Sequence, residues 1–153
     1  AMDPKNIHGY VLGEHGNDAF VAWSTVNCAG LGIDHLDEYF HFEKKLDRHD
    51  VEQGLIQTAY DVINLKGFTN TGIAMVACRF IKAILYNEHT ILPCAAVMNG
   101  EYGMKDVALS IPRMIAQDGI VRAFEVHLAD EEMEKLRRAQ KSVRAALDGA
   151  GVK

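Results

Sequence analysis

Residues 9–17 read GYVLGEHGN, an apolar strand pattern that ends in a loop between two glycines. Gly13 and Gly16 allow the backbone to bend sharply there and allow a ligand to approach His15 closely. An imidazole with an unperturbed pKa of about 6.5 can donate or accept a proton around neutral pH. The stretch therefore predicts a proton-transfer histidine at the end of a strand, although a lone histidine in a turn can also be purely structural.

Two consecutive helices are predicted in the middle of the chain. Apolar residues recur at helical spacing over 51–63, and the pattern ends near Lys66-Gly67, where a basic residue and a glycine suit a helix C-terminus. The same periodicity returns over 73–85. Because only the break at 67–72 separates them, we expect the two helices to pack together and a ligand to reach the break.

The pattern changes after the second helix. Between residues 91 and 128, apolar and other residues alternate in two segments, around Leu109 and around Val126, which predicts half-buried antiparallel strands. Asp130 is predicted to cap a final helix, and residues 149–153 look like a frayed tail. One face of that helix is expected to consist of Met133, Leu136, Gln140, Val143 and Leu147. Grouped helices and strands indicate an α+β fold.

Composition restricts the functional classes. The 153 residues suit one domain, the net charge of −5 offers no basic footprint for nucleic acid, and no apolar run approaches the length that spans a bilayer. We therefore expect neither a nucleic-acid nor a membrane partner. A basic cluster in the final helix is interpreted as a solvated helix face. It consists of Arg138, Lys141 and Arg144.

No metal site is predicted. His35, His41 and His49 are separated by six and eight residues, which matches no short zinc motif. Three cysteines are few, odd in number and far apart, so they are interpreted as reduced packing residues of a cytoplasmic protein. These are Cys28, Cys78 and Cys94. A metal-dependent hydrolase that uses several of the seven histidines stays a competing hypothesis, testable by the metal content of the purified protein.

The GEHG segment and several later motifs resemble the lactate/malate dehydrogenase family, in the family's order. The later motifs are KGFTNTGIA at 66–74, ILP at 91–93, GEYG at 100–103, LSIP at 109–112 and DGI at 118–120. The chain is identified as a member of this family over essentially residues 1–153, and the match favours the lactate branch. The resemblance implies the family's C-terminal substrate domain, with paired long helices, antiparallel strands and a C-terminal helix.

The resemblance also implies roles for individual residues. His15 would exchange a proton with the substrate oxygen while NAD and the 2-oxo or 2-hydroxy acid exchange hydride, interconverting pyruvate and L-lactate. Thr69 matches the position that lines the substrate pocket, although a threonine before a helix can simply be a cap. Ile73 matches the position that packs on the nicotinamide face, although any buried helix needs such a residue. His8 matches a histidine that binds a sugar-bisphosphate effector in some bacterial members, although a surface strand can also carry it.

The sequence holds no dinucleotide-binding fingerprint. Gly30 and Gly32 supply only the first two glycines of GxGxxG, and Gly67 and Gly72 have P-loop spacing without the following Lys-Ser/Thr. The resemblance implies that the family's N-terminal NAD-binding Rossmann domain, with two arginines and the aspartate that orients the histidine, is absent here. We therefore expect the isolated chain to be inactive, as an engineered fragment or a truncated gene product, with Ala1-Met2 compatible with a cloning scar.

Two alternatives concern function within the family. Asn17 departs from the aspartate usual after GEHG and resembles the branch that acts on bulkier acids such as 2-hydroxyisocaproate. As a fragment, the chain could also be a non-catalytic oligomerisation module, since surfaces covered in a complete enzyme would be exposed. The resemblance implies at least a homodimer, with a tetramer as the family's usual assembly.

Overall fold

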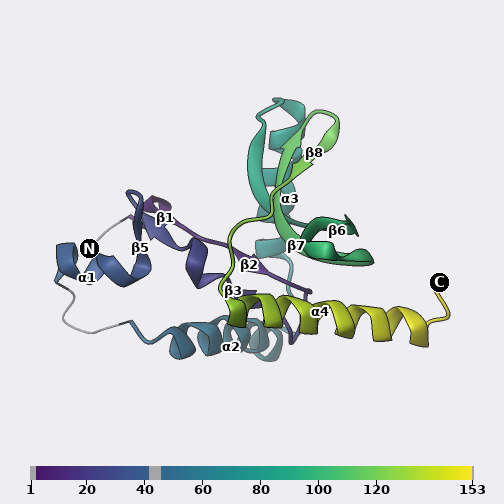
Figure 1. Ribbon diagram of the computed structural model, residues 1–153, viewed down its shortest axis with the longest axis horizontal. Coiled ribbons are helices and arrows are strands. Elements are labelled where there is room, and N and C mark those ends of the chain that lie inside the picture. Colours follow the sequence, from purple (N-terminus) through teal and green to yellow (C-terminus); the bar gives the residue numbers. More distant parts are fainter. Residues whose placement is uncertain (1–2, 42–45, 153) are drawn as a thin grey trace. The chain divides into compact units, whose positions relative to one another are not determined.

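The computed structural model describes residues 3–41 and 46–152 (Figure 1). Ala1-Met2, to which the cloning-scar expectation applies, and the last residue of the expected frayed tail lie outside the described residues. The chain divides into two compact units. Unit 1 consists of Ala1–Lys45, Pro93–Pro112 and Ala123–Lys153, and unit 2 consists of Leu46–Leu92 and Arg113–Arg122.

The N-terminal part of unit 1 is built from short elements. They are η1 (Pro4–Asn6), β1 (Ile7–His8), β2 (Val11–Leu12), β3 (Phe20–Val21), η2 (Trp23–Thr25), β4 (Asn27–Cys28), β5 (Leu31–Gly32), η3 (Ile33–His35) and α1 (Leu36–Phe40). Strands β2 and β3 pair antiparallel, with Leu12 opposite Phe20. A separate antiparallel sheet has the order β1-β4-β5. The predicted strand before His15 is therefore β2, and the histidine lies in the loop between β2 and β3.

Helix α4 (Asp130–Gly149) supplies much of the core of unit 1. Leu136 and Ala139 are both 0% exposed, and the partly buried Met133, Val143 and Leu147 pack against the same cluster. The other buried members of this cluster are Leu12, Phe20, Ala22, Met98, Met104, Val107, Leu109, Ile111 and Leu128. The four apolar residues of the predicted face are thus confirmed as part of the core, while Gln140, its polar member, is half-buried outside the cluster. Each fully buried Leu, Val, Ile, Phe or Met side chain in such a cluster contributes about 1.5–3 kcal/mol to the free energy of unfolding.

The predicted cap of α4 is wrong. The N-cap is Ala129, and Asp130 is the first helical residue. Alanine has no side chain that can accept a hydrogen bond, so the capping acceptor comes from within the first turn. The Glu132 carboxylate accepts the Ala129 backbone N–H at 2.9 Å, which is half of a capping box.

Three longer strands follow α3 in the sequence. They are β6 (Thr90–Asn99), β7 (Lys105–Ala116) and β8 (Gly119–Ala123), in the sheet order β6-β7-β8, with η4 (Glu101–Gly103) between the first two. Val107, Leu109 and Ile111 are at most 1% exposed, so the predicted alternation in β7 is confirmed. A two-residue turn joins β7 to β8, and the following Gly119 has a φ of +91°, which glycine adopts readily.

The second predicted strand, around Val126, is wrong because β8 ends at Ala123. Residues 124–128 still alternate between more and less buried side chains, but beyond the Phe124 N–H, which donates to the Pro112 carbonyl at 2.9 Å, their backbone is bonded by side chains. The Tyr102 hydroxyl donates to the Val126 carbonyl at 2.9 Å, and the Tyr102 N–H donates to the Glu125 carboxylate at 3.0 Å. Burial raises the pKa of Tyr102 to about 12, so the phenol stays protonated and can donate this hydrogen bond.

Unit 2 contains α2 (Arg48–Lys66) and α3 (Thr71–Leu85). Asp47 caps α2 by accepting two backbone N–H groups, and Gly67 ends it with a φ of +83°, as predicted. From the middle of α3, the Arg79 guanidinium donates to the Thr90 hydroxyl at 2.8 Å and forms an ion pair with Glu88.

The two helices follow each other as predicted, but they do not bury their apolar faces against each other. They bend by 119° at the break between them. Many apolar side chains are left 38% or more exposed, among them Leu55, Ile56, Tyr60, Ile63, Leu65, Phe68, Ile73, Met75, Val76 and Ile81. Within the described ranges, no single helix is long and apolar enough to cross a membrane, and α2 and α3 pass that test only as a bent pair.

Replacing Leu136 by alanine should destabilise unit 1. The side chain is fully buried, so the cavity left behind should lower the free energy of unfolding by about 2–5 kcal/mol. Trp23 is the single tryptophan of the sequence and belongs to unit 1, so its fluorescence in a urea titration reports on this unit. Lys141→Ala, at an exposed position of the same helix, is the control and should cost less than about 0.5 kcal/mol. Equal losses in both variants would contradict the packing.

Candidate functional site

The loop that carries His15 begins at a backbone pairing between Gly13 and Ser110. The Gly13 N–H donates to the Ser110 carbonyl at 3.1 Å, and the Ser110 N–H donates to the Gly13 carbonyl at 2.8 Å. Gly13 has a φ of +97°, and a Cβ atom at this position would lie 2.7 Å from the Asp18 carbonyl oxygen. The first glycine of the GEHG motif is therefore required both by its backbone conformation and by the close return of the loop.

The second glycine makes room for the Glu14 side chain. The Glu14 carboxylate accepts the Asp18 N–H at 2.9 Å, and the Gly16 carbonyl accepts the Ala19 N–H at 3.3 Å. A Cβ atom on Gly16 would lie 2.6 Å from both Glu14 carboxylate oxygens. Glu14 thus closes the loop internally, since its carboxylate binds the backbone of Asp18.

His15 itself is exposed at the tip of this loop. Among the residues that the structure describes, its ring has no hydrogen-bond or ion-pair partner. Asp18, the other carboxylate of the loop, instead forms an ion pair with Arg138 of α4, with Oδ1 and Nε 3.0 Å apart. The imidazole is therefore accessible to a small molecule, and its catalytic role stays a prediction.

A buried carboxylate secures the segment that follows the hairpin. Glu132 is 6% exposed and accepts the Ser24 N–H at 3.0 Å and the Ser24 hydroxyl, in addition to the Ala129 N–H. Burial by itself raises the pKa of this carboxyl, but the hydrogen bonds from Ser24, Ala129 and Trp23 outweigh it and hold the pKa below its usual value. Our sequence reasoning missed Glu132, although its place in the first helical turn is a capping-box position.

The other predicted site residues lie in different parts of the chain. His8 is exposed in β1 of unit 1, opposite Asn27 of β4. Thr69 and Ile73 belong to unit 2, where Thr69 is exposed just before α3 and Ile73 is 62% exposed on that helix. Asn70, and not Thr69, caps α3 by accepting the Thr71 N–H at 2.8 Å. That Thr69 and Ile73 line one pocket with His15 stays a prediction.

The remaining histidines and the cysteines do not form a cluster. His35, His41 and His49 are exposed, and His35 lies 3.5 Å from a Glu38 carboxylate oxygen. In residues 3–41 and 46–152, no group of three or more His, Cys, Asp and Glu side chains could hold a metal ion. The three cysteines are free thiols, and one of them is exposed rather than packed. Cys28 is buried, Cys94 is half-buried and Cys78 is exposed.

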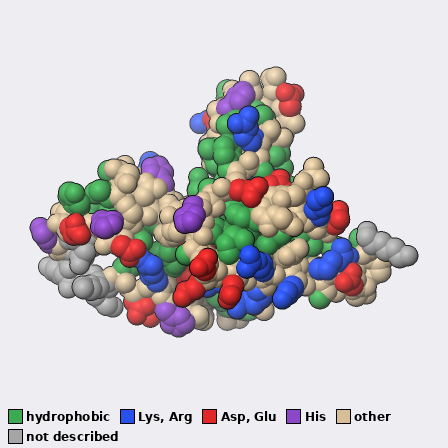
Figure 2. All heavy atoms as spheres, in the orientation of Figure 1, with side chains coloured by type: hydrophobic (Ala, Val, Ile, Leu, Met, Phe, Trp, Pro, Cys, Tyr) green, Lys and Arg blue, Asp and Glu red, His purple; other side chains and the backbone are tan. Residues whose placement is uncertain are grey.

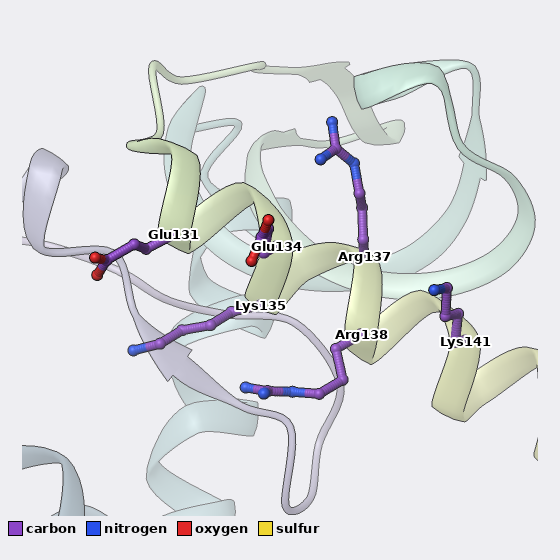
Figure 3. Close-up of a pocket in the computed structure, with 6 residues that line it drawn as sticks. All are labelled: Glu131, Glu134, Lys135, Arg137, Arg138 and Lys141. Carbon is purple, nitrogen blue, oxygen red and sulfur yellow. The ribbon is translucent and has the colours of Figure 1, made fainter.

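A shallow depression runs along the surface of α4 (Figure 3). Charged side chains of both signs line it: Glu131, Glu134, Lys135, Arg137, Arg138 and Lys141. Figure 3 shows Lys135 and Arg138 extending on one side of the helix and Arg137 on another. Basic and acidic side chains are likewise interspersed over the face in Figure 2. Lys141 and Arg138 of the basic cluster are exposed, as interpreted from the sequence, although Arg138 pairs with Asp18. Arg144 departs from that interpretation, because its guanidinium is half-buried and donates to the backbone carbonyls of Asp106 and Val152.

Comparison with known proteins identifies the family. The family model for the lactate/malate dehydrogenase alpha/beta C-terminal domain matches residues 1–151. The chain belongs to this family. The L-lactate dehydrogenase of Selenomonas ruminantium is 72% identical over 99% of this chain, and L-lactate dehydrogenase 2 of Clostridium acetobutylicum is 43% identical over 97%. Among these dehydrogenases, the chain spans 48% and 46% of the respective lengths, so it corresponds to about half of each relative.

Solved structures of the family have the same fold. The minor L-lactate dehydrogenase of Enterococcus mundtii, in a ligand-bound form, has a TM-score of 0.86 with 33% identity over 96% of this chain. A lactate dehydrogenase from a Medee basin deep-sea metagenome library has a TM-score of 0.88 with 30% identity, also over 96% of this chain. In both cases 47% of the other chain is covered. The α+β C-terminal-domain fold predicted from the motifs is thereby confirmed.

Gly13→Ala should loosen the His15 loop and destabilise unit 1. The left-handed backbone costs an alanine about 1–2 kcal/mol, and the contact with the Asp18 carbonyl adds to that cost. Gly149→Ala is the control, because a Cβ atom there meets nothing within 4 Å. Urea unfolding followed by Trp23 fluorescence measures both variants. Indistinguishable midpoints for Gly13→Ala and the unsubstituted chain would refute the tight loop geometry.

The Glu132 carboxylate should make the stability of unit 1 depend on acidic pH. The pKa of this carboxyl in the folded state lies below the ordinary value of 4.5. Its contribution to the free energy of unfolding is therefore complete above that pH and is lost as the pH falls through the folded-state pKa. Glu132→Gln should lower the free energy of unfolding by about 1–3 kcal/mol at pH 7 and flatten this part of the pH profile. Glu131→Gln, at the exposed neighbouring position, should keep the profile. A profile that stays unchanged in Glu132→Gln would contradict this assignment.

Proposed function

We propose that this chain forms the substrate-binding, proton-transferring half of an NAD-dependent L-lactate dehydrogenase that interconverts pyruvate and L-lactate. The observation that carries the proposal is the exposed His15 in a loop whose two glycines are both required by close contacts. The support from relatives is the 72% identity to an L-lactate dehydrogenase over 99% of the chain.

His15 has the properties required of a proton donor and acceptor. In the reducing direction its protonated imidazole gives a proton to the carbonyl oxygen of the 2-oxo acid, and in the reverse direction the neutral ring takes the hydroxyl proton. The exposed tip of the loop lets a small acid reach the ring, while Glu14 and Asp18 are engaged elsewhere. We propose that the carboxylate that orients His15 comes from the half of the enzyme that this chain does not supply.

The residues of this chain would contact the nicotinamide ring of NAD but would not hold its pyrophosphate. The exposed apolar side chain of Ile73 suits one face of a nicotinamide ring, and the neighbouring Thr69 offers a methyl and a hydroxyl group to the substrate. The sequence lacks the glycine fingerprint that would hold the pyrophosphate. When bound, NADH supplies the hydride that reduces the carbonyl carbon. We therefore propose that the chain shares the cofactor with a nucleotide-binding half and is inactive alone.

Assembly, regulation and location are part of the same proposal. The apolar side chains exposed on α2 and α3 are of the kind that a subunit interface covers, which supports a homo-oligomer, with the tetramer implied by the family. Exposed His8 would contribute to a sugar-bisphosphate effector site.

The three free thiols support a reducing compartment such as the cytoplasm, and we propose no nucleic-acid, membrane or metal partner.

A hybrid enzyme tests the function directly. The hybrid joins this chain to the half of the Selenomonas ruminantium dehydrogenase that the chain does not cover, and it is assayed for NADH oxidation beside the chain alone. Pyruvate should be reduced by the hybrid and not by the chain alone. His15→Gln should lower kcat/KM by at least about 100-fold, since a general acid contributes that much or more. His35→Gln, at an exposed histidine outside the loop, is the matched control.

Substrate choice separates the main candidate from its alternatives. Preference for 2-oxoisocaproate over pyruvate and oxaloacetate would assign the chain to the branch that acts on bulkier acids, which Asn17 favours. A folded hybrid that binds NADH and reduces none of the three acids would overturn the enzymatic proposal. The exposed apolar faces of α2 and α3 would then favour the oligomerisation module.

A further inference from the structure

One ion pair joins the His15 loop to the long helix of unit 1. Asp18 Oδ1 and Arg138 Nε are 3.0 Å apart, and both residues belong to the same compact unit. The Asp18 side chain is 21% exposed, whereas that of Arg138 is 65% exposed. The carboxylate is therefore largely enclosed by the loop and the helix, while the guanidinium reaches it from the surface.

Asp18 is the point at which the restraints on the loop meet. Its N–H donates to the Glu14 carboxylate at 2.9 Å. Its carbonyl oxygen packs closely against Gly13, where an added Cβ atom would lie only 2.7 Å from that oxygen. The ion pair adds a restraint from outside the loop, through a helix that is anchored by the buried Leu136. His15 lies between Gly13, paired to Ser110, and Asp18, paired to Arg138, so both ends of its loop are fastened to the core structure.

We infer that Asp18 and Arg138 are positioning residues that hold the His15 loop in the orientation needed for proton transfer. This inference rests on the proposed function. An ion pair with one exposed partner contributes little to overall stability, because water and salt screen it. Its effect is local, since a misplacement of a proton-transfer group by about 1 Å can cost 100-fold in rate.

The surface of α4 provides a matched comparison. Arg137 and Arg138 are adjacent, both exposed, and both line the same depression, but they extend on different sides of the helix (Figure 3). Only Arg138 of the two forms an ion pair with Asp18. Removing either guanidinium changes the net charge and helix composition in the same way, so a difference between the two variants isolates the contact with the loop.

Amide hydrogen exchange measured by NMR on this chain gives the first test. Arg138→Gln should speed exchange at the Asp18 and Ala19 amides by about fivefold or more, because local opening of the loop becomes easier. Amides of β7 should be unaffected. Arg137→Gln should leave the loop amides unchanged, and Arg138→Lys should restore much of the protection because it keeps the positive charge. Equal exchange in Arg137→Gln and Arg138→Gln would overturn the inference.

The hybrid enzyme gives the second test. Arg138→Gln and Asp18→Asn should each lower kcat for pyruvate by about tenfold with little change in KM, since a loosened acid affects the transition state more than substrate binding. Arg138→Lys should recover most of kcat, and intact Trp23 fluorescence should show that the variants are folded. An active hybrid whose kcat is insensitive to Arg138→Gln would overturn the positioning role alone. A hybrid without activity would overturn the proposed function, and hydrogen exchange would still decide whether the pair orders the loop.

Discussion

The backbone pairing between Gly13 and Ser110 is the constraint on which the candidate site depends. It joins a short hairpin of only two residues per strand to β7, the longest of the strands that the structure describes, through two hydrogen bonds of 3.1 and 2.8 Å. A hairpin with two residues in each strand buries too little surface to be stable alone. The pairing gives it the rigidity of the β7 core, and the positive φ of Gly13 then turns the chain directly into the His15 loop.

Different faces of helix α4 contact the apolar core and the His15 loop. Leu136 and Ala139 close the apolar cluster, while Glu132 binds the backbone and hydroxyl of Ser24, and Arg138 reaches Asp18. A single rigid element can therefore hold the loop and the segment after the hairpin at set distances from the core. The buried contacts supply the stability, and the polar contacts determine where the surrounding loops lie.

Strong local patterns made much of this fold predictable. The alternation in β7, the apolar face of α4 and the glycine that ends α2 each depend on neighbouring residues, and all three are confirmed. Two predictions failed for different reasons. Strand β8 ends at Ala123, and the Val126 carbonyl instead accepts a hydrogen bond from Tyr102, 24 positions away. At α4 the competing group is local, since Asp130 is already the first helical residue and Glu132 accepts the Ala129 N–H.

The residue order alone was sufficient to recognise the family and to select His15. The GEHG motif combines a titratable ring with two glycines, and contacts within the same short loop require both glycines. It could not reveal Glu132 or Arg138 as partners of this region, since Glu132 is 108 positions from Ser24 and Arg138 is similarly distant from Asp18. Such contacts exist only after α4 has packed on the core. Folding therefore decided which charged side chains support the histidine loop, because hydrogen bonds and ion pairs require proximity in space rather than in sequence.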